Sequence, residues 1–137
     1  MTAIENKRFI QGIHAELAKG NGRPFVDSLA EDFNWIMKGR TAWSRTYQGK
    51  RAVQEELLKP LYAQFEGLYR NTAQRFIAED DFVVVQCDGD VATRSGKRYD
   101  NQYCFIYRLA DGKVVELTEY LDTALVDAAL EAPAHAG

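Results

Sequence analysis

The strongest constraint on the fold of this chain is a change of hydrophobic period near residue 70. From there to residue 121, apolar side chains recur at every second position, which is typical of strands with one buried face. Short turn sequences divide the run into four strands, at residues 72–80, 82–93, 97–109 and 113–121. Because strands joined by so few residues pair antiparallel, the second half of the chain predicts an antiparallel meander.

The first half of the chain follows a helical period instead. Apolar spacing predicts helices at residues 2–19, 24–33 and 50–66, with Pro60 kinking or ending the third. A short strand is expected at residues 34–39 and an irregular loop at 40–49. A last short helix is expected after Asp122, whose carboxylate suits a helix N-cap. These elements predict an α+β fold, with three N-terminal helices packed in a curved antiparallel sheet.

Length and composition fit one globular domain. The chain has 137 residues, of which 46% are hydrophobic and 27% charged, with no internal repeat or linker. We expect a single domain over residues 1–130 and a flexible C-terminal tail over residues 131–137. The net charge of −3 and the lack of a basic run argue against nucleic acid as a partner. No apolar run approaches the ~18 residues that a membrane helix needs, so no membrane partner is expected.

Cysteine and histidine usage bears on location and cofactors. The N-terminus has no apolar secretory core, and Cys87 and Cys104 lie in strands without a CxxC spacing. We therefore expect reduced cysteines in a cytoplasmic protein. With only His14 and His135 in the chain, no zinc site is expected. The Gly-rich turns do not precede helices as phosphate loops do, so no cofactor is predicted.

The last hairpin decides which way the acids of residues 113–122 point. A three-residue loop over 110–112, with Gly112 in the left-handed conformation, fits the sequence and pairs Leu109 with Lys113. Counting back by twos then pairs Tyr103 with Glu119 and places both on one face.

The preceding hairpin has the same form and pairs Thr93 with Lys97, hence Cys87 with Tyr103. Cys104 falls on the opposite face from Cys87, so a disulfide between them is not expected. One face, which we expect to lie under the helices, holds a single acid, Glu119, among apolar and aromatic residues: Val83, Val85, Cys87, Tyr103, Phe105, Tyr107, Val115, Leu117 and Leu121. The other face holds Val84, Gln86, Gln102, Cys104, Ile106, Glu116, Thr118 and Tyr120.

Two alternatives stay open for this acid. A two-residue loop at Asp111-Gly112 would reverse the faces and put Glu116 beside Tyr107. An inward Glu119 can also be purely structural, accepting hydrogen bonds from Tyr103, Asn101 or an arginine such as Arg45. In a functional role it would be a buried acid with a raised pKa.

Three segments resemble the SnoaL-like and ketosteroid-isomerase-like proteins of the nuclear transport factor 2-like superfamily. They are "YQGKRAV" at the start of the third helix, "YDNQYCFIYRLADGKVVELTEYLDT", and the "DFNWIMKG" strand. The resemblance covers roughly residues 5–128. It implies a cone in which a strongly bent antiparallel sheet wraps around helices and leaves an apolar pocket at its open end. The pattern specifies a fold more than an activity, since this scaffold hosts many functions.

The SnoaL-like cyclases use a pocket aspartate as acid/base on the last strand, a few residues after a Gly-Lys turn. Counted from Gly112-Lys113, that position is Glu119, the residue that the hairpin geometry also turns inward. The three residues of the ketosteroid isomerase mechanism are not matched, because their positions fall at Ile13, near Met37, and at Phe105 or Cys104. The resemblance therefore implies Glu119 as the catalytic residue.

Two hypotheses of function follow. In the first, the protein is a cofactor-independent isomerase, aldol cyclase, dehydratase or hydrolase acting on a small apolar molecule through Glu119. In the second, it is a non-catalytic ligand-binding or dimerisation module. An apolar outer sheet face and the resemblance both predict a homodimer. The residues expected to contact a ligand are Tyr103, Asn101, Trp35, Leu117, Leu121 and His14.

Overall fold

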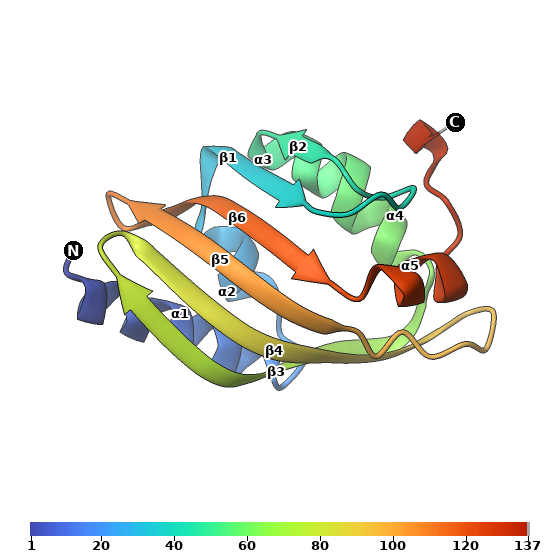
Figure 1. The fold of residues 1–137 in the computed structure, drawn as a ribbon, viewed down its shortest axis with the longest axis horizontal. Helices are drawn as coiled ribbons and strands as arrows, with labels where there is room; N and C mark the ends of the chain where they lie inside the picture. The colour runs from blue at the N-terminus through green and yellow to red at the C-terminus, as the bar shows by residue number, and fades with distance from the viewer. Residues whose placement is uncertain (137) are drawn as a thin grey trace.

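A computed structural model describes residues 1–136 and shows helices packed against one six-stranded sheet (Figure 1). The helical segments are α1 (Ala3–Leu17), α2 (Arg23–Asp27), α3 (Lys50–Ala52), η1 (Val53–Leu58), α4 (Lys59–Tyr62), α5 (Thr123–Ala129) and the 3₁₀ turn η2 (Ala134–Ala136). The strands are β1 (Leu29–Met37), β2 (Thr46–Gln48), β3 (Phe65–Glu79), β4 (Phe82–Thr93), β5 (Gln102–Ala110) and β6 (Lys113–Leu121). The predicted α+β fold is confirmed.

The strand order is β2-β1-β6-β5-β4-β3. The meander of β3 to β6 is antiparallel as predicted. The sheet as a whole is not, because β1 runs parallel to β6 and pairs Met37 with Glu119 and Trp35 with Leu117. The sequence pattern could not predict this pairing, since β1 and β6 are separated by most of the chain.

The helix α1 begins at a capping box in which Thr2 and Glu5 bond each other's backbone. Its buried face holds Ile10, Ile13, His14 and Leu17, and packs on β3 and β4. The predicted helix at residues 24–33 is wrong beyond Asp27. Leu29 starts β1 and pairs with Val114, so strand pairing overrides the helical spacing of Phe25, Val26 and Leu29.

The third predicted helix exists, but it ends at Tyr62 and contains the π-helical segment η1 just before Pro60. Proline lacks an N–H and its ring crowds the carbonyl one turn earlier, so a wider turn at this point relieves that clash. The strand β3 then begins at Phe65, seven residues before the predicted start. Gly67, with φ +88°, lies where the pairing of β3 with β4 is interrupted.

The last hairpin differs from the prediction in two compensating ways. Ala110 pairs with Lys113 across a two-residue turn in which Asp111 (φ 52°) and Gly112 (φ 75°) both have positive φ, as a type I′ turn requires. A bulge at Val115 then shifts the register, so that Leu109 pairs with Val114 and Arg108 with Glu116. Because the bulge restores the alternation, Glu119 faces inward, but its cross-strand partner is Phe105 and not Tyr103.

The third strand of the meander begins at Gln102 and not at residue 97 as predicted. The predictions for the preceding hairpin and for the cysteines are confirmed. Thr93 bonds Lys97 across the preceding hairpin, and Cys87 pairs with Tyr103. Both cysteines are free, with Cys87 buried and Cys104 half-buried. The prediction that Val115 faces inward is wrong, because the bulge leaves it half-buried and puts Val114 in the core instead.

The C-terminal segment consists of a capped helix and the residues that follow it. Asp122 caps α5 as expected, accepting from the N–H groups of Ala124 and Leu125. A tail was expected at residues 131–137, of which residue 137 lies outside the described residues. In this segment the Glu131 carbonyl accepts from the Trp43 indole at 3.0 Å, and the His135 ring packs on Tyr47. No helix within residues 1–136 is long and apolar enough to cross a membrane.

Candidate functional site

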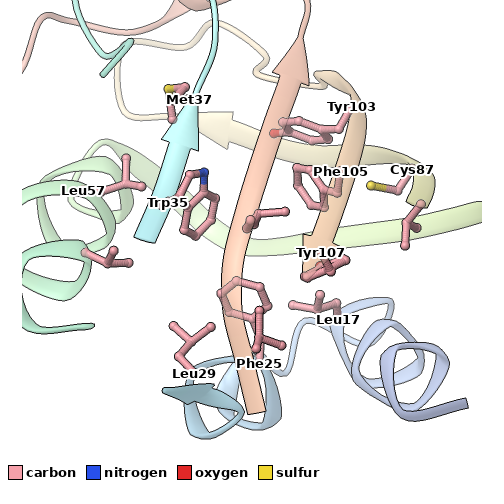
Figure 2. Packing of buried hydrophobic residues seen from close by; sticks show 14 of the residues in the cluster. Leu17, Phe25, Leu29, Trp35, Met37, Leu57, Cys87, Tyr103, Phe105 and Tyr107 are labelled. Atoms are coloured by element: carbon pink, nitrogen blue, oxygen red, sulfur yellow. The ribbon is translucent and has the colours of Figure 1, made fainter. Parts of the chain in front are cut away.

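Glu119 lies on the inner face of β6, between β1 and β5 in the sheet. Its side chain is only 4% exposed. The indole Nε1 of Trp35 donates a hydrogen bond of 2.8 Å to the Glu119 Oε1. The side chains of Trp35 and Met37 on β1 and of Tyr103 and Phe105 on β5 lie on either side of β6 (Figure 2), so the carboxylate is set among large apolar and aromatic groups.

The structure contradicts the partners expected for a structural acid. Neither Tyr103 nor Asn101 bonds the carboxylate, and Arg45 instead pairs with Glu56 at 3.6 Å near the surface. Within residues 1–136 no cation forms an ion pair with Glu119. Burial therefore raises the pKa of Glu119 to about 7, and the Trp35 hydrogen bond only partly opposes this rise. Near neutral pH the group can both accept and donate a proton.

The carboxylate of Glu119 is in the wall of a cavity of about 660 Å³. This volume is in the usual range for small-molecule sites. The wall is mostly apolar and comes from both halves of the chain, including Leu17, Phe25, Trp35, Met37, Leu57, Phe65, Phe105, Val126 and Leu130. Besides Glu119, the charged residues that line it are Arg23 and Asp27 of α2 and Lys50 and Lys59 of the 50–62 helix; Lys50 is half-buried and the other three are exposed.

Polar groups other than Glu119 also reach the cavity. Tyr69, Tyr99 and Tyr103 line it, and so does Asn71. The ring of Phe65 stacks between those of Tyr69 and Tyr99, with centroid distances of 5.7 and 6.0 Å. Burial raises the pKa of each of these tyrosines, and the nearby Glu119 raises those of Tyr99 and Tyr103 further. Their hydroxyls therefore keep their protons and can act as hydrogen-bond donors.

His14 is fully buried behind the cavity wall. Its Nε2 lies 2.8 Å from the Tyr107 hydroxyl and its Nδ1 lies 3.2 Å from the Asn71 Oδ1. Burial lowers the pKa of His14 to about 4, so the ring is neutral at pH 7. It does not border the cavity, and its expected contact with a ligand is replaced by a contact with Asn71.

Of the residues predicted to form the site, the structure brings Trp35, Tyr103 and Glu119 to the cavity wall and leaves the others off it. Asn101 is buried, with its amide bonded to neighbouring groups of the chain. Leu117 is fully buried between Trp35 and Tyr107 in the sheet, and Leu121 is half-buried at the end of β6. Asn101 and Leu117 point inward as predicted but are covered by neighbouring groups, and Leu121 does not border the cavity.

Sequence reasoning missed Tyr69, Asn71 and Tyr99. Tyr69 and Asn71 lie in the first part of β3, which the sequence pattern left outside the strand. A signal was present, because Phe65, Tyr69 and Asn71 are spaced by even numbers and therefore share a strand face. Within residues 1–136 no group of three His, Cys, Asp or Glu side chains is placed to hold a metal ion.

The fold and the site define a class of protein in which helices pack against a curved sheet and enclose an apolar cavity with a buried acid in its wall. Residues 10–117 match the family model of the SnoaL-like domain. The chain therefore belongs to the SnoaL-like family. The comparison with curated proteins found no relative.

Solved structures share this fold at low identity. The chain is similar to Bal32a from a soil-derived mobile gene cassette, with a TM-score of 0.78 and 20% identity over 92% of this chain and 96% of that one. It is also similar to a putative SnoaL-like polyketide cyclase from Jannaschia sp. CCS1, with a TM-score of 0.75 and 20% identity over 96% and 94%. A third is TerC, co-crystallised with polyporic acid, with a TM-score of 0.72 and 20% identity over 90% and 95%. At these identities the likeness shows the fold.

Proposed function

We propose that this protein is a cofactor-independent acid/base enzyme acting on a small, mostly apolar organic molecule. The observation that carries the proposal is the Glu119 carboxylate in the cavity wall, buried, free of an ion pair within residues 1–136, and with its pKa raised to about 7. A base with a pKa near the working pH combines a sufficient ionised fraction with sufficient proton affinity. The neighbours described as a putative polyketide cyclase and as a complex with polyporic acid support an organic ligand.

In the proposed mechanism, ionised Glu119 removes a proton from carbon next to a ligand carbonyl. The electron pair of that C–H bond moves onto the carbonyl oxygen, and the Tyr103 hydroxyl donates a hydrogen bond to the resulting enolate. Glu119, now protonated, returns the proton to carbon or to a leaving oxygen. Isomerisation, aldol cyclisation and dehydration share this first step, and epoxide hydrolysis uses the same base on water.

The second candidate is a non-catalytic ligand-binding module of the same fold. The observation that favours it is that the ketosteroid isomerase positions hold apolar residues: Ile13 and Met37 are in the core. This module would keep the cavity but would not move a proton. The two candidates differ in one measurable property, the exchange of a bound ligand's acidic C–H protons with solvent.

The test uses 2-acetonaphthone, an apolar methyl ketone smaller than the cavity. We expect it to bind the protein and quench tryptophan fluorescence, and its methyl protons to exchange with deuterium oxide faster than in buffer, as followed by proton NMR. Because the base must be ionised, the rate should rise with pH through about 7. Binding without accelerated exchange would favour the non-catalytic module, and absence of binding would contradict the ligand site itself.

We further propose a homodimer packed through the outer sheet face. That face carries half-buried Val84, Cys104, Ile106 and Thr118 and exposed Tyr120. The alternative is a monomer in which α5 covers this face. In the structure that helix contributes Val126 to the cavity wall. A sheet face of this composition is better buried than left in water.

Replacing Ile106 with lysine tests the dimer. The wild type is expected to sediment as a dimer at micromolar concentration, and Ile106→Lys as a monomer or an aggregate, because a charge would be buried at the interface. Lys113→Ala at the end of the same strand pair is the control and should leave the dimer intact. A monomeric wild type would refute this part of the proposal.

For location we propose the cytoplasm. Both cysteines are free, and β-strand geometry puts them on opposite faces of the sheet, so they gain nothing from an oxidising compartment.

A further inference from the structure

Two buried asparagines, Asn71 and Asn101, donate hydrogen bonds to tyrosine hydroxyls of the cavity wall, and the side-chain oxygen of each faces a donor. The Asn101 Oδ1 accepts from the backbone N–H of Gln102 at 2.7 Å and of Asp122 at 3.0 Å. Backbone N–H groups can only donate, so these two bonds fix the amide orientation. The Asn101 Nδ2 must then point the other way, where it donates to the Tyr99 hydroxyl at 3.2 Å.

Asn71 repeats this arrangement on β3. Its Oδ1 faces the Nδ1 of His14, and its Nδ2 donates to the Tyr69 hydroxyl at 3.2 Å. His14 is neutral and carries one ring proton, and an oxygen of Asn71 can only accept, so that proton is on Nδ1. The unprotonated Nε2 then accepts from the Tyr107 hydroxyl. Tyr107, His14 and Asn71 thus form a chain of donors that ends at Tyr69.

The consequence concerns the hydroxyl protons of Tyr69 and Tyr99. Each oxygen accepts from an asparagine amide, so each O–H proton must be donated in another direction, toward Tyr103 or the cavity. Phe65 holds the two rings by stacking between them. Gly89 leaves the room for this packing, because a Cβ there would lie 3.0 Å from the Tyr69 hydroxyl and 3.1 Å from the Tyr103 ring.

We propose that Asn71 and Asn101 are positioning residues, which turn this wall of the cavity into a site of hydrogen-bond donors for a ligand oxygen. The substrate class is then a molecule with an acceptor oxygen, such as a ketone or a quinone, at the end that reaches Tyr69, Tyr99 and Tyr103. This inference rests on the proposed function and deepens it, since the same donors would stabilise the enolate oxygen formed when Glu119 removes a proton.

The most informative variant is Asn71→Asp, which keeps the shape of the side chain and exchanges its donor for an acceptor. The Tyr69 proton should then turn to the introduced carboxylate and away from the ligand. Asn6→Asp is the matched control, because Asn6 is also a buried asparagine, 3% exposed, but lies on α1 away from the cavity wall. Tyr69→Phe provides a second route to the same loss, should Asn71→Asp not fold.

The experiment compares 2-acetonaphthone with 2-isopropenylnaphthalene, in which a methylene group replaces the carbonyl oxygen. The wild type should bind the ketone about tenfold more tightly than the hydrocarbon, as expected for a hydrogen bond inside a cavity. The ¹³C-labelled carbonyl stretch of the bound ketone should lie at lower frequency than in an apolar solvent. A purely structural role for Asn71 would not affect this frequency in a folded variant.

In Asn71→Asp and Tyr69→Phe we expect the preference for the ketone to fall to about twofold or less. The carbonyl stretch should move to higher frequency, the hydrocarbon Kd should stay almost unchanged, and Asn6→Asp should match the wild type. Equal binding of the two compounds by the wild type, or variants that keep both preference and frequency, would overturn the donor assignment alone. Failure of the wild type to bind either compound would instead contradict the proposed function.

Discussion

Glu119→Gln is expected to slow the exchange of the methyl protons of bound 2-acetonaphthone by about 10²- to 10⁴-fold, the usual contribution of a general base. Glutamine keeps the length of the side chain, and its carbonyl oxygen can still accept from the Trp35 indole. It cannot take up a proton at neutral pH. The Kd of the ketone should therefore change little while the exchange rate collapses, and proton NMR together with fluorescence quenching separates the two quantities.

The control for this variant is Glu116→Gln, three residues earlier on the same strand. Glu116 faces the other side of the sheet and lies 3.9 Å from Arg108, where it is partly exposed. Its replacement should leave the exchange rate unchanged and alter the free energy of unfolding by only about 0.5 kcal/mol. Equal exchange rates in the wild type and Glu119→Gln would remove Glu119 from the mechanism.

The second large effect concerns the dependence of stability on pH, where two buried groups act in opposite directions. Burial raises the pKa of Glu119 from 4.5 to about 7. The contribution of Glu119 to the free energy of unfolding therefore falls as pH rises through that range. Burial lowers the pKa of His14 from 6.5 to about 4. The contribution of His14 to the free energy of unfolding therefore falls as pH falls through that range. Shifts of this size each correspond to about 3 kcal/mol.

The pH ranges over which Glu119 and His14 change the stability overlap, so their opposite effects nearly cancel in the wild type. Replacing one of the two groups should make the pH dependence due to the other visible. In Glu119→Gln the free energy of unfolding should gain up to about 3 kcal/mol over the wild type as pH rises to about 8, and almost nothing at about pH 4. The free energy of unfolding of His14→Gln, relative to that of the wild type, should be highest at about pH 4 and should fall by about 3 kcal/mol toward pH 7. Subtracting the wild-type curve cancels the groups common to both proteins.

Urea unfolding across this pH range measures both curves. A Glu119→Gln curve that runs parallel to the wild type would mean that the carboxylate titrates normally, and it would remove the basis for a general acid/base role. A sharp loss of stability at every pH would instead indicate that Glu119 is a structural acid. The same comparison for His14 shows whether the ring is held neutral behind the cavity.

The direction of Glu119 was predicted correctly from the wrong strand register. The three-residue loop assumed for residues 110–112 keeps the acid on the inner face, and the observed two-residue turn by itself would reverse it. The bulge at Val115 reverses it again. What made the prediction hold is the apolar pattern, because Leu117 and Phe105 can be buried only if Glu119 shares their face.

The amino-acid sequence by itself determined the α+β fold, the meander, the inward acid and the Asp122 helix cap, because period, turn chemistry and capping are local properties. Tertiary structure decided the rest of the site. The parallel pairing of β1 with β6 brings Trp35 to Glu119, and the early start of β3 brings Tyr69 and Asn71 to the cavity. A period-two pattern tells which way a side chain points, but whether it meets another side chain or open space depends on elements far apart in the chain. For this reason Glu119 and Tyr103 border the cavity, whereas Leu117, equally inward, is covered.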